Sequence, residues 1–475
     1  MKSLKFTFLA ALVALATSCA APTEKIIIIS TSDIHSKLDM LPRLATFVDE
    51  VRAQDTARVF LVDAGDRWTG DPYVDMAPNA GLPIIEQMNR LGYDVATFGN
   101  HEFDMGLDTL QRRVEDVEFD LVLANVDTKE TAWKQPKPYT IKRAGRAKVG
   151  FIGLVTNYAN GHPDGKDRIF VGTEFFSPEW AGQRYGRELR EKCDVMVVIS
   201  HCGLDRDTTN VASSFPMADL IVSGHTHERY SGTANGVAVV QGNNKLRAVG
   251  LTTISLRRGK VESVATEYLE LPEVEKESTR AEIQNYINDP YLNETIGTLT
   301  AEANKTALAQ MMADEGRRVA GTDLAFYHIG GTRINHLAEG PVRRADIYEL
   351  EPFSSDLVVT TMTLAEIEEM IINKFNDTTN YKESHRRDLI PSGMRYTIVT
   401  DPITGDAVDI RFDIPRRKEL YTVAMSNYVF ENKTYPYTRR AEDGRTPLVT
   451  SYLFDRLAEG PYTPDCRERV FVVKN

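Results

Sequence analysis

Cysteine is scarce in this sequence. Only four of its 475 residues are Cys. Three of them, Cys193, Cys202 and Cys466, lie beyond the first residues, and an odd number without a close-spaced pair excludes a disulfide framework. Cys193 and Cys202 stand in apolar surroundings, so we expect both to be small residues of a hydrophobic core.

Long hydrophobic runs and an excess of positive charge are also missing. Beyond the N-terminal leader no stretch has about 18 consecutive apolar residues, so no membrane-spanning helix is predicted there. The net charge of −12 argues against binding of a nucleic acid polymer, which requires a basic face, but allows a local basic pocket for a small phosphate ester. With 42% hydrophobic and 26% charged residues the composition is globular, and the length predicts two or three domains.

The N-terminus has the pattern of a signal peptide. Basic residues precede an apolar run, Phe6–Leu15, and small residues follow it. We therefore predict a signal peptide over 1–19 and export from the cytoplasm to the periplasm or cell surface. The residues before Cys19 resemble a bacterial lipobox, with Ala16 where Leu is usual, which predicts a lipid anchor on Cys19. Ordinary secretion, with Cys19 removed, is the alternative.

Residues that can bind a metal ion follow predicted strands at five places in the first half of the chain. The first such strand, Lys25–Ser30, contains a continuous β-branched run, which is typical of a strand buried on both faces. Five of the nine His residues fall just past strands of this kind. A polar turn would explain any one of these positions, but not their repetition. The candidate metal ligands are Asp33, His35, Asp66, Asn100, His201, His225 and His227.

These side chains can meet, because residues at the carboxyl ends of strands lie along one edge of a sheet. Mixed carboxylate, amide and imidazole ligands suit divalent ions such as Zn, Mn, Fe or Co. The candidates are too many for one tetrahedral ion, whereas two ions that share a carboxylate would use them all. Such ions lie about 3.5–4 Å apart and hold the oxygens of an in-line displacement at phosphorus. The sequence therefore predicts a centre for two divalent metal ions.

The stretch Gly99–Asp104 adds a candidate acid to these ligands. It follows a predicted strand, 93–98, and precedes a predicted helix from Leu107, so we expect it on a loop at the carboxyl end of a strand. His101 has Asp104 three residues later, and a carboxylate partner can orient a histidine as a proton donor. A satisfied polar turn is the alternative for an isolated Asn-His pair.

These motifs resemble the five sequence blocks of the calcineurin-like metallophosphoesterases. The blocks are Asp33-Ile34-His35, Gly65-Asp66, Gly99-Asn100-His101-Glu102, His201 and Gly224-His225-Thr226-His227, in the order of that family. The extended block Asn100-His101-Glu102-Phe103-Asp104 and the second half of the chain resemble the 5′-nucleotidase branch in particular. The resemblance implies an α/β fold, in which a metallophosphoesterase β-sandwich flanked by helices is followed by a smaller α+β substrate-recognition domain.

The resemblance also implies domain limits. A metallophosphoesterase domain is expected over 25–272 and a 5′-nucleotidase C-terminal domain over 301–475. Residues 273–300 are expected to form a connecting helix and linker, in which the Asp289-Pro290 step interrupts a weak helical period.

Carried over residue by residue, the resemblance implies a role for each site residue. Asp33, His35 and His227 would hold the first metal ion, and Asn100, His201 and His225 the second. Asp66 would bridge both ions. His101 would face the departing oxygen without binding a metal, and Asp104 would orient it.

The second half of the chain has features of a small-molecule site. Two Gly residues before Arg333 let the backbone approach a ligand. Arg333 could bind a phosphate through two N–H groups. A plain turn is the alternative interpretation of this Gly-Gly-Thr-Arg stretch. The elements His328-Ile329-Gly330-Gly331-Thr332-Arg333, Pro352-Phe353 and Asn427-Tyr428 resemble, in order, those of the 5′-nucleotidase substrate domain. This resemblance implies that Phe353 and Tyr428 stack on the two faces of a base. Without it, both would be interpreted as core residues.

The substrate domain departs from the family pattern. His328 stands where the family has Asn, and Val429-Phe430-Glu431-Asn432-Lys433 replaces a Gly-Gly-Asp-Gly element. The Asp that contacts the ribose or base therefore has no clear counterpart. The match to a further phosphate-binding arginine falls on Arg317 or Arg318. The predicted catalytic site is complete, whereas the predicted specificity site is altered.

The sequence thus predicts an exported two-metal phosphomonoesterase acting on nucleoside 5′-monophosphates or related phosphate esters. One alternative is a phosphodiesterase or nucleotide-sugar pyrophosphatase that uses the same metal centre. Another is a surface lipoprotein that captures nucleotides without chemistry. A missing metal ligand would be the expected sign of the second alternative, and none is missing from the motifs.

Overall fold

The computed structural model describes residues 23–54, 57–129, 131–158, 161–353, 355–378, 384–431 and 444–474. The predicted signal peptide and the predicted anchor at Cys19 lie outside these residues. Within them Cys193 and Cys202 are buried, Cys466 is exposed, and all three are free thiols, as predicted. None of the described helices combines the length and the apolar character needed to cross a membrane.

A six-stranded mixed sheet forms one layer of the N-terminal half. Its strands lie in the order β14 (Lys260–Leu269), β13 (Val249–Arg257), β1 (Thr23–Thr31), β2 (Arg58–Asp63), β3 (Val95–Ala96) and β4 (Asp120–Leu121). Strands β1 to β4 run parallel, and β13 runs antiparallel to both of its neighbours. The carboxyl ends of β1, β2 and β3 therefore lie at the same edge of the sheet.

A second six-stranded sheet forms the other layer. Its strands lie in the order β11 (Arg229–Ala234), β12 (Val237–Gly242), β10 (Leu220–Ser223), β9 (Val195–His201), β7 (Ala147–Val155) and β6 (Tyr139–Ala144). The four central strands run parallel and the two edge strands antiparallel. A short antiparallel pair, β5 (Val126–Asp127) and β8 (Glu174–Phe175), lies outside both sheets.

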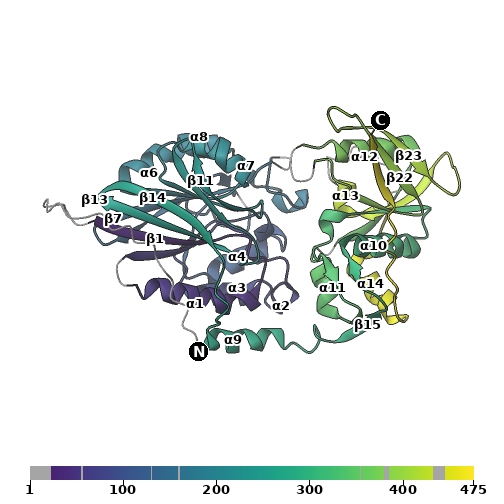
Figure 1. Cartoon of the computed structure of the whole chain (residues 1–475), viewed down its shortest axis with the longest axis horizontal. Helices are drawn as coiled ribbons and strands as arrows, with labels where there is room; N and C mark the ends of the chain where they lie inside the picture. The colour runs from purple at the N-terminus through teal and green to yellow at the C-terminus, as the bar shows by residue number, and fades with distance from the viewer. Residues whose placement is uncertain are drawn as a thin grey trace.

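The two sheets pack face to face because side chains alternate between the faces of each strand. Ile28 and Phe60 of the first sheet share a core cluster with Phe151 and Val197 of the second. The outward-facing side chains pack on helices. These helices are α1 (Leu41–Arg52), α3 (Leu82–Leu91) and α4 (Leu107–Asp116) on the first sheet, and α5 (Pro178–Ala181), α6 (Arg187–Lys192) and α8 (Ala212–Ser214) on the second. The predicted β-sandwich flanked by helices is therefore confirmed (Figure 1).

The connecting segment contains α9 (Glu277–Ile287), which ends just before the Asp289-Pro290 step. Ile283 of this helix is buried in the core cluster that also contains α1. Arg280 Nη2 donates a hydrogen bond to the backbone oxygen of Asp39 at 3.0 Å. The connecting helix therefore packs on the first half of the chain, along the lower side of Figure 1.

A five-stranded mixed sheet organises the C-terminal half. Its strands lie in the order β21 (Leu389–Ser392), β17 (Leu324–His328), β24 (Tyr421–Ser426), β20 (Asp356–Met362) and β25 (Gly444–Leu448). Helices α10 (Lys305–Ala320) and α14 (Val449–Ala458) cover one face. The other face packs on α12 (Leu364–Phe375) and on a three-stranded sheet of β23 (Ala407–Asp413), β22 (Arg395–Thr400) and β26 (Val470–Lys474). This half is the predicted smaller α+β unit.

Short elements complete the described fold. They are α2 (Pro72–Asp75), α7 (Leu204–Arg206), α11 (Arg344–Leu350), α13 (Asn427–Glu431), and the two-stranded pairs β15 (Thr295–Leu299) with β19 (Gly340–Arg343) and β16 (Ala303–Asn304) with β18 (His336–Leu337).

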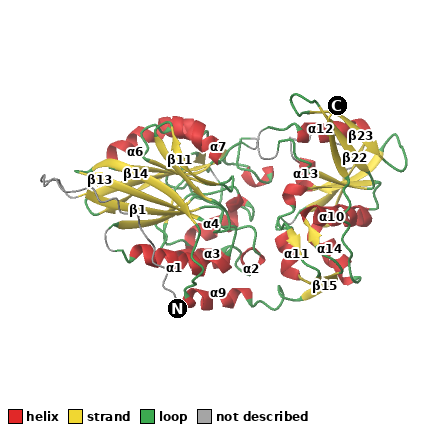
Figure 2. Ribbon diagram, viewed as in Figure 1, coloured by secondary structure: helices red, strands yellow, loops and turns green. Residues whose placement is uncertain are grey.

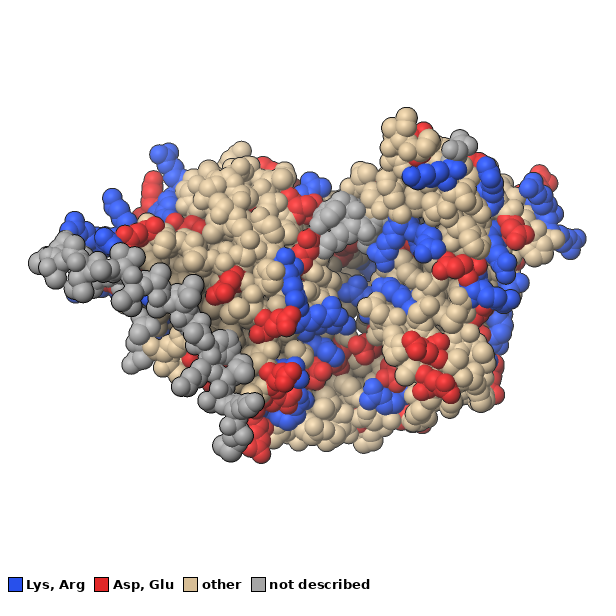
Figure 3. Space-filling view, in the orientation of Figure 1, with Lys and Arg blue, Asp and Glu red and all other residues tan. Residues whose placement is uncertain are grey.

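The two halves lie side by side and contact each other across a hollow (Figures 2 and 3). Lys166 Nζ of the first half donates a hydrogen bond to the backbone oxygen of Phe353 at 3.0 Å. Lys245 Nζ of the first half lies 3.9 Å from Glu349 Oε1 of the second. A substrate in this hollow would be in reach of residues from both halves.

Candidate metal centre and substrate cleft

The loops that follow β1, β2, β3, β9 and β10 meet at one edge of the sandwich. The backbone N–H of Asp33 donates to Gly65 O at 2.9 Å, and that of His35 donates to Asp66 O at 3.0 Å, so the first two loops are joined directly. The backbone N–H of His225, beyond β10 in the other sheet, donates to Asp33 Oδ1 at 3.0 Å. These bonds bring the predicted ligands of the two sheets together.

Asp33, His35 and His227 form one cluster, with ligand atoms within 4.8 Å of one another. His227 Nε2 lies 3.3 Å from Asp33 Oδ1 and 3.1 Å from His35 Nε2. These are the three residues that the family resemblance assigns to the first metal ion.

Asp66, His201 and His225 form a second cluster within the same 4.8 Å limit. His201 Nε2 lies 3.1 Å from Asp66 Oδ2, and Asn100 Oδ1 lies 2.9 Å from His225 Nδ1. Asp66 also belongs to a third set with His35 and His101. The Asp66 carboxylate therefore lies between the two predicted metal positions, where a bridging ligand would lie.

The protonation of these histidines fits a cation at each position. His201 Nδ1 donates to the backbone oxygen of Ala64 at 2.6 Å, so its Nε2 is the ring atom that faces the Asp66 carboxylate, and this buried Nε2 has no hydrogen-bond partner among the described residues. His35 Nδ1 likewise donates to Thr69 O at 2.8 Å, which turns its lone pair toward His227. Asn244 Nδ2 donates to His227 Nδ1, so His227 Nε2 carries the hydrogen that points at the His35 lone pair, and a metal ion at this position would replace that hydrogen.

The pKa values of the cluster differ from one histidine to the next. Burial and the neighbouring His227 lower the pKa of His35 well below its usual value, and burial together with His201 lowers the pKa of His225 to about 4. Both imidazoles are neutral at pH 7, as metal binding requires. Burial alone would raise the pKa of Asp33, but His227 and His201 outweigh it and lower the value to about 2. Burial also opposes a charge on His201, yet the Asp66 carboxylate raises its pKa to about 10, so a metal ion here would displace a proton.

The ligand loops adopt a rare backbone conformation. The φ angles are positive at Asp33 (53°), His35 (48°), Asp66 (59°), His225 (76°) and His227 (57°). A left-handed conformation costs a residue with a side chain about 1–3 kcal/mol and is concentrated at functional sites. Surrounding hydrogen bonds therefore hold these five side chains in directions that relaxed loops would not give.

His101 and Asp104 form the predicted acid pair. His101 Nδ1 lies 2.7 Å from Asp104 Oδ2, and the backbone N–H of His101 donates to Asp66 Oδ1 at 2.9 Å. Burial lowers the pKa of His101, but Asp104 and then Asp66 outweigh it and raise the value to about 9. His101 is thus protonated at neutral pH and lies directly beside the predicted bridging carboxylate.

Glu102 has a structural role that the motif alone did not reveal. Its buried carboxylate accepts hydrogen bonds from the backbone N–H groups of Asp66 at 2.9 Å, Arg67 at 2.7 Å and Gly99 at 2.5 Å. The buried Arg67 guanidinium lies beside it and donates to Thr97 O at 2.6 Å. Glu102 therefore fixes the loop of Asp66 against the loop of Asn100 and His101.

Asn244 was also missed by sequence reasoning. Its Nδ2 lies 3.1 Å from His227 Nδ1 and helps to fix that ring. It lies in the loop between β12 and β13, and no motif marks it. Only the folded chain could identify it.

The second half contributes two of its three predicted substrate residues directly. The Phe353 ring stacks on His101, with ring centroids 6.0 Å apart and planes at 27°. The Arg333 guanidinium lies 5.5 Å from the centroid of the same Phe353 ring. Tyr428 stacks instead on His328 at 4.5 Å and 21°, so one face of the Tyr428 ring is already covered.

Arg317 and Arg318, the two positions matched to a further phosphate-binding arginine, have protein partners in the structure. Both lie in the last turn of α10, where Arg317 donates to Asp323 O and Arg318 pairs with Glu315. The helix begins at Lys305, about 18 Å away at 1.5 Å per residue.

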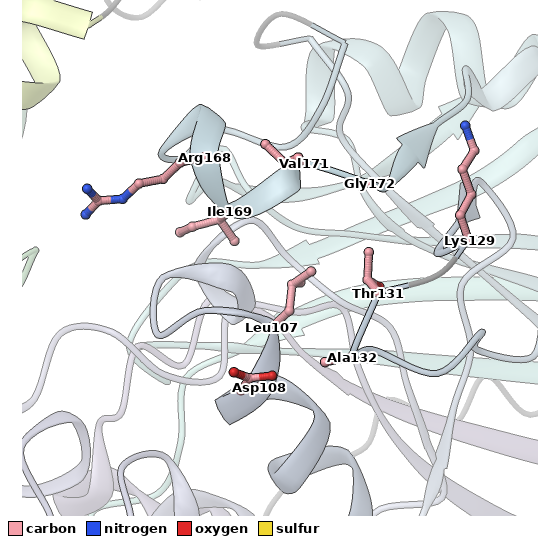
Figure 4. Close-up of a pocket in the computed structure, with 9 residues that line it drawn as sticks. All are labelled: Leu107, Asp108, Lys129, Thr131, Ala132, Arg168, Ile169, Val171 and Gly172. Carbon is pink, nitrogen blue, oxygen red and sulfur yellow. The ribbon is translucent and has the colours of Figure 1, made fainter.

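A separate pocket of about 730 Å³ lies beside the start of α4 (Figure 4). Its lining includes Leu107, Ile169 and Val171, and none of the predicted metal-binding or catalytic residues contributes to it. This pocket is therefore distinct from the candidate metal centre, which is a cluster of nearly buried side chains.

Comparison with known families agrees with this geometry. Residues 26–229 match the family described as calcineurin-like phosphoesterase, and residues 287–438 match the 5′-nucleotidase, C-terminal domain. The two matched segments follow each other in the order of the two halves of the fold. The residues of both predicted metal positions lie within the first match.

Individual relatives cover much of the chain. It is 26% identical over 447 positions to Protein UshA of Yersinia enterocolitica, which covers 78% of this chain and 80% of that protein. It is also 26% identical to Endonuclease YhcR of Bacillus subtilis over 89% of this chain, but spans only 38% of that relative's length. The crystal structure of a 5′-nucleotidase precursor from Thermus thermophilus shares the fold, with a TM-score of 0.80 over 94% of this chain and 99% of that one, at 23% identity.

Proposed function

Because the chain belongs to the 5′-nucleotidase family of calcineurin-like phosphoesterases and is a metal-dependent phosphoester hydrolase, we propose that it acts on nucleoside 5′-monophosphates or related small phosphate monoesters. One observation carries this proposal: the clusters Asp33-His35-His227 and Asp66-His201-His225 are connected through a third set, in which Asp66 meets His35 and His101, and His101 pairs with Asp104. Shared carboxylates of this kind are typical of two-metal sites that hydrolyse phosphate esters.

The proposed ligands fall into two sets, and each would hold one divalent ion such as Zn, Mn, Fe or Co. The first set is Asp33, His35 and His227, the second is Asn100, His201 and His225, and Asp66 bridges them. When bound, the two ions would neutralise charge on the phosphate and lower the pKa of a water molecule.

The remaining site residues would position the substrate and move one proton. We assign His101 as the donor of a proton to the departing oxygen, with Asp104 holding its ring in orientation. Arg333 would bind phosphate oxygens from the second half, since a guanidinium offers two parallel N–H groups. Phe353 and Tyr428 are proposed to contact a base, each with one ring face.

We further propose that the protein acts outside the cytoplasm, in the periplasm or at the cell surface, with a lipid anchor on Cys19. The charged start and short apolar run of residues 1–19 support export. The proposed domain limits are 25–272 for the metallophosphoesterase domain and 301–475 for the 5′-nucleotidase C-terminal domain. Replacement of Cys19 by Ala should move the protein from the membrane fraction to the soluble fraction, whereas an unchanged distribution would rule out the anchor.

The catalytic proposal is tested with a panel of phosphate esters and several divalent ions. Purified protein should release inorganic phosphate from AMP or another nucleoside 5′-monophosphate when Mn²⁺ or Zn²⁺ is present, and not after chelation. Absence of phosphate release from every monoester would contradict the proposal. A protein that only captures nucleotides would return them unchanged after hours, but the presence of every predicted ligand argues against that alternative.

A phosphodiesterase is the second candidate, because one relative is named an endonuclease. The same two metal positions could hold a diester or diphosphate as well as a monoester. The ratio of rates on AMP and on a cyclic nucleotide or nucleotide sugar distinguishes the two functions. A faster rate on the diester or diphosphate would favour this second candidate.

A further inference from the structure

Two loops that carry proposed ligands of the second metal position are joined at Thr226. This residue lies between His225 and His227, beyond the end of β10. Its Oγ1 accepts a hydrogen bond at 3.1 Å from the backbone N–H of Leu204, which lies just beyond His201. The Thr226 hydroxyl therefore connects the loop of His225 directly to the loop of His201.

The same two loops also approach each other closely. Gly203 has a φ of 95°, a backbone conformation that favours glycine. A Cβ atom at this position would lie 3.1 Å from Cγ2 of Thr226 and 3.5 Å from Cδ2 of His225. The Thr226 side chain thus lies between the loops, with its methyl group against Gly203 and its hydroxyl bonded to Leu204.

Gln241, near the end of β12, holds the loop that carries His225 and His227. Its side chain is buried, and its Oε1 accepts hydrogen bonds from Thr226 Oγ1 at 3.2 Å and from the backbone N–H of Glu228 at 2.9 Å. Because a backbone N–H bonds only to an acceptor, these contacts fix which way the Gln241 amide points. Thr226 and Glu228 are the two neighbours of His227, so Gln241 holds the chain on both sides of that histidine.

These bonds act where the backbone is strained. His225 has a φ of 76° and His227 a φ of 57°. A left-handed conformation is unfavourable for a residue with a side chain, and it persists only where surrounding contacts enforce it. Thr226 lies between the two histidines and Glu228 directly follows them, so their bonds to Gln241 are placed to enforce this conformation.

We propose that Thr226 and Gln241 are positioning residues of the metal centre, and that Thr226 serves the second metal position while Gln241 serves both. Thr226 joins the loops of His201 and His225, which are both assigned to the second position. Gln241 holds the neighbours of His227, which is assigned to the first position, and through the Thr226 hydroxyl it also supports the second. The inference rests on the proposed metal centre and adds two residues that belong to neither set of ligands.

Calorimetric titration of Mn²⁺ or Zn²⁺ into metal-free protein tests the proposal, and elemental analysis counts the ions bound. Thr226→Val removes the hydroxyl and keeps the shape of the side chain, so the affinity of one binding step should fall by about tenfold or more. Thr226→Ser keeps the hydroxyl and should retain most of that affinity. Gln241→Leu should weaken both steps.

Ligand variants identify the step that Thr226→Val weakens. His227→Ala removes a ligand of the first position only, and the remaining step should still weaken when Thr226→Val is added. His201→Ala removes a ligand of the second position only, and Thr226→Val should then have no effect on the remaining step. The opposite pattern would show that Thr226 does not serve the second position.

Two buried side chains of the second half provide matched controls. Thr400 donates one hydrogen bond to Val473 O at 3.3 Å, and Gln310 donates one to Asp465 O at 2.5 Å. Thr400→Val and Gln310→Leu remove the same chemical groups from the other half of the chain and should leave both binding steps unchanged. Urea unfolding of the metal-free variants measures any loss of stability separately from the loss of metal affinity.

Three results would overturn the inference. They are unchanged affinity of both steps in Thr226→Val, a loss that Thr226→Ser does not restore, and an equal loss in Thr400→Val. The Thr226 variants decide the inference by themselves if Gln241→Leu does not fold. In each case two ions bound to the unmodified protein would leave the proposed metal centre intact. If the unmodified protein binds no transition-metal ion, both the proposed centre and this inference fail.

Discussion

His35 and His227, which lie 192 residues apart in the chain, hold their Nε2 atoms 3.1 Å apart. His35 donates its other ring N–H to Thr69 O, so its facing nitrogen carries a lone pair. Two sheets and a left-handed backbone at both residues are needed to produce this contact. His227 Nε2 lies 3.3 Å from Asp33 Oδ1 as well, so these three ligand atoms surround one position where a proton or a metal ion would be held.

Removal of metal should therefore abolish activity and lower stability. Chelation is expected to lower the Tm, because an ion at 100 times its Kd stabilises the folded state by about 2.7 kcal/mol per site. Elemental analysis of active protein should give two transition-metal ions per chain, and re-addition of the ions should restore both activity and Tm. Full activity in metal-free protein would contradict the proposed centre.

Replacement of His101 by Ala should reduce kcat by about 10²–10⁴-fold, the usual contribution of a positioned acid. Metal content should stay unchanged, because His101 is assigned to the leaving oxygen and not to an ion. His336→Ala changes an exposed histidine that pairs with Glu302 and serves as the control. Loss of one metal ion from His101→Ala would show that His101 is a ligand.

Asp104→Asn should change the pH dependence of kcat. Asp104 is the strongest influence that raises the pKa of His101, whose value is about 9. The acid form of His101 is the active one, so activity falls as the pH rises through this pKa. Without the Asp104 carboxylate the pKa falls, and the alkaline decline of kcat should begin at lower pH.

The control for Asp104→Asn is a second His–Asp pair outside the site. His162 Nε2 lies 3.2 Å from Asp167 Oδ1, and Asp167→Asn should leave the alkaline limb in place. A profile of kcat across the neutral and alkaline range measures the shift. An unchanged limb in Asp104→Asn would show that His101 does not act as the acid.

The ligand positions were predictable because they obey a local rule. A β-branched or apolar strand followed by Asp, Asn or His places that residue at the carboxyl edge of a parallel sheet, as for Asp66 after β2 and His225 after β10. The burial of a strand is visible in a few consecutive apolar residues. The residue at the carboxyl end of that strand can therefore be identified from the sequence too. The β-sandwich and the α+β unit followed from the same patterns and from the family resemblance.

The contacts that hold the predicted ligands in place were not predictable, because they join loops that are distant in sequence. Nothing near Asn244 or Thr69 indicates that they contact His227 and His35. Arg317 was matched by its position in the chain, but its side chain donates to the backbone oxygen of Asp323, just beyond the end of α10. The direction of a side chain depends on packing that only the complete fold determines.

Glu102→Gln should weaken both folding and metal binding. Gln can no longer accept all three backbone hydrogen bonds, and the buried Arg67 loses part of its charge compensation. The free energy of unfolding should fall by about 1–3 kcal/mol. Metal affinity should fall by about 10–100-fold, as for other residues that orient ligands.

Urea unfolding of the metal-free protein and calorimetric titration of metal ions separate these two effects. Glu118→Gln, at an exposed position, is the matched control and should change neither quantity. Normal metal affinity in a folded Glu102→Gln protein would show that the Asp66 loop keeps its position without Glu102.

Phe353→Ala tests whether the second half recognises a base. Loss of a stacking ring costs about 1–3 kcal/mol per base, so KM for AMP should rise by roughly fivefold or more. Glycerol 3-phosphate has no ring, and its KM should stay close to that of the unmodified protein. Phe471→Ala, which removes an exposed aromatic side chain from the same half, should affect neither substrate.

The contacts of Phe353 make the comparison informative. Its ring lies against both His101 and Arg333, while its backbone oxygen accepts the hydrogen bond from Lys166, which the substitution retains. If Phe353 contacts the base, only nucleotides lose affinity. If its task is to hold His101 and Arg333 in place, kcat for AMP and for glycerol 3-phosphate falls by the same factor. An equal loss on both substrates would therefore reject base stacking and assign Phe353 to the support of the catalytic residues.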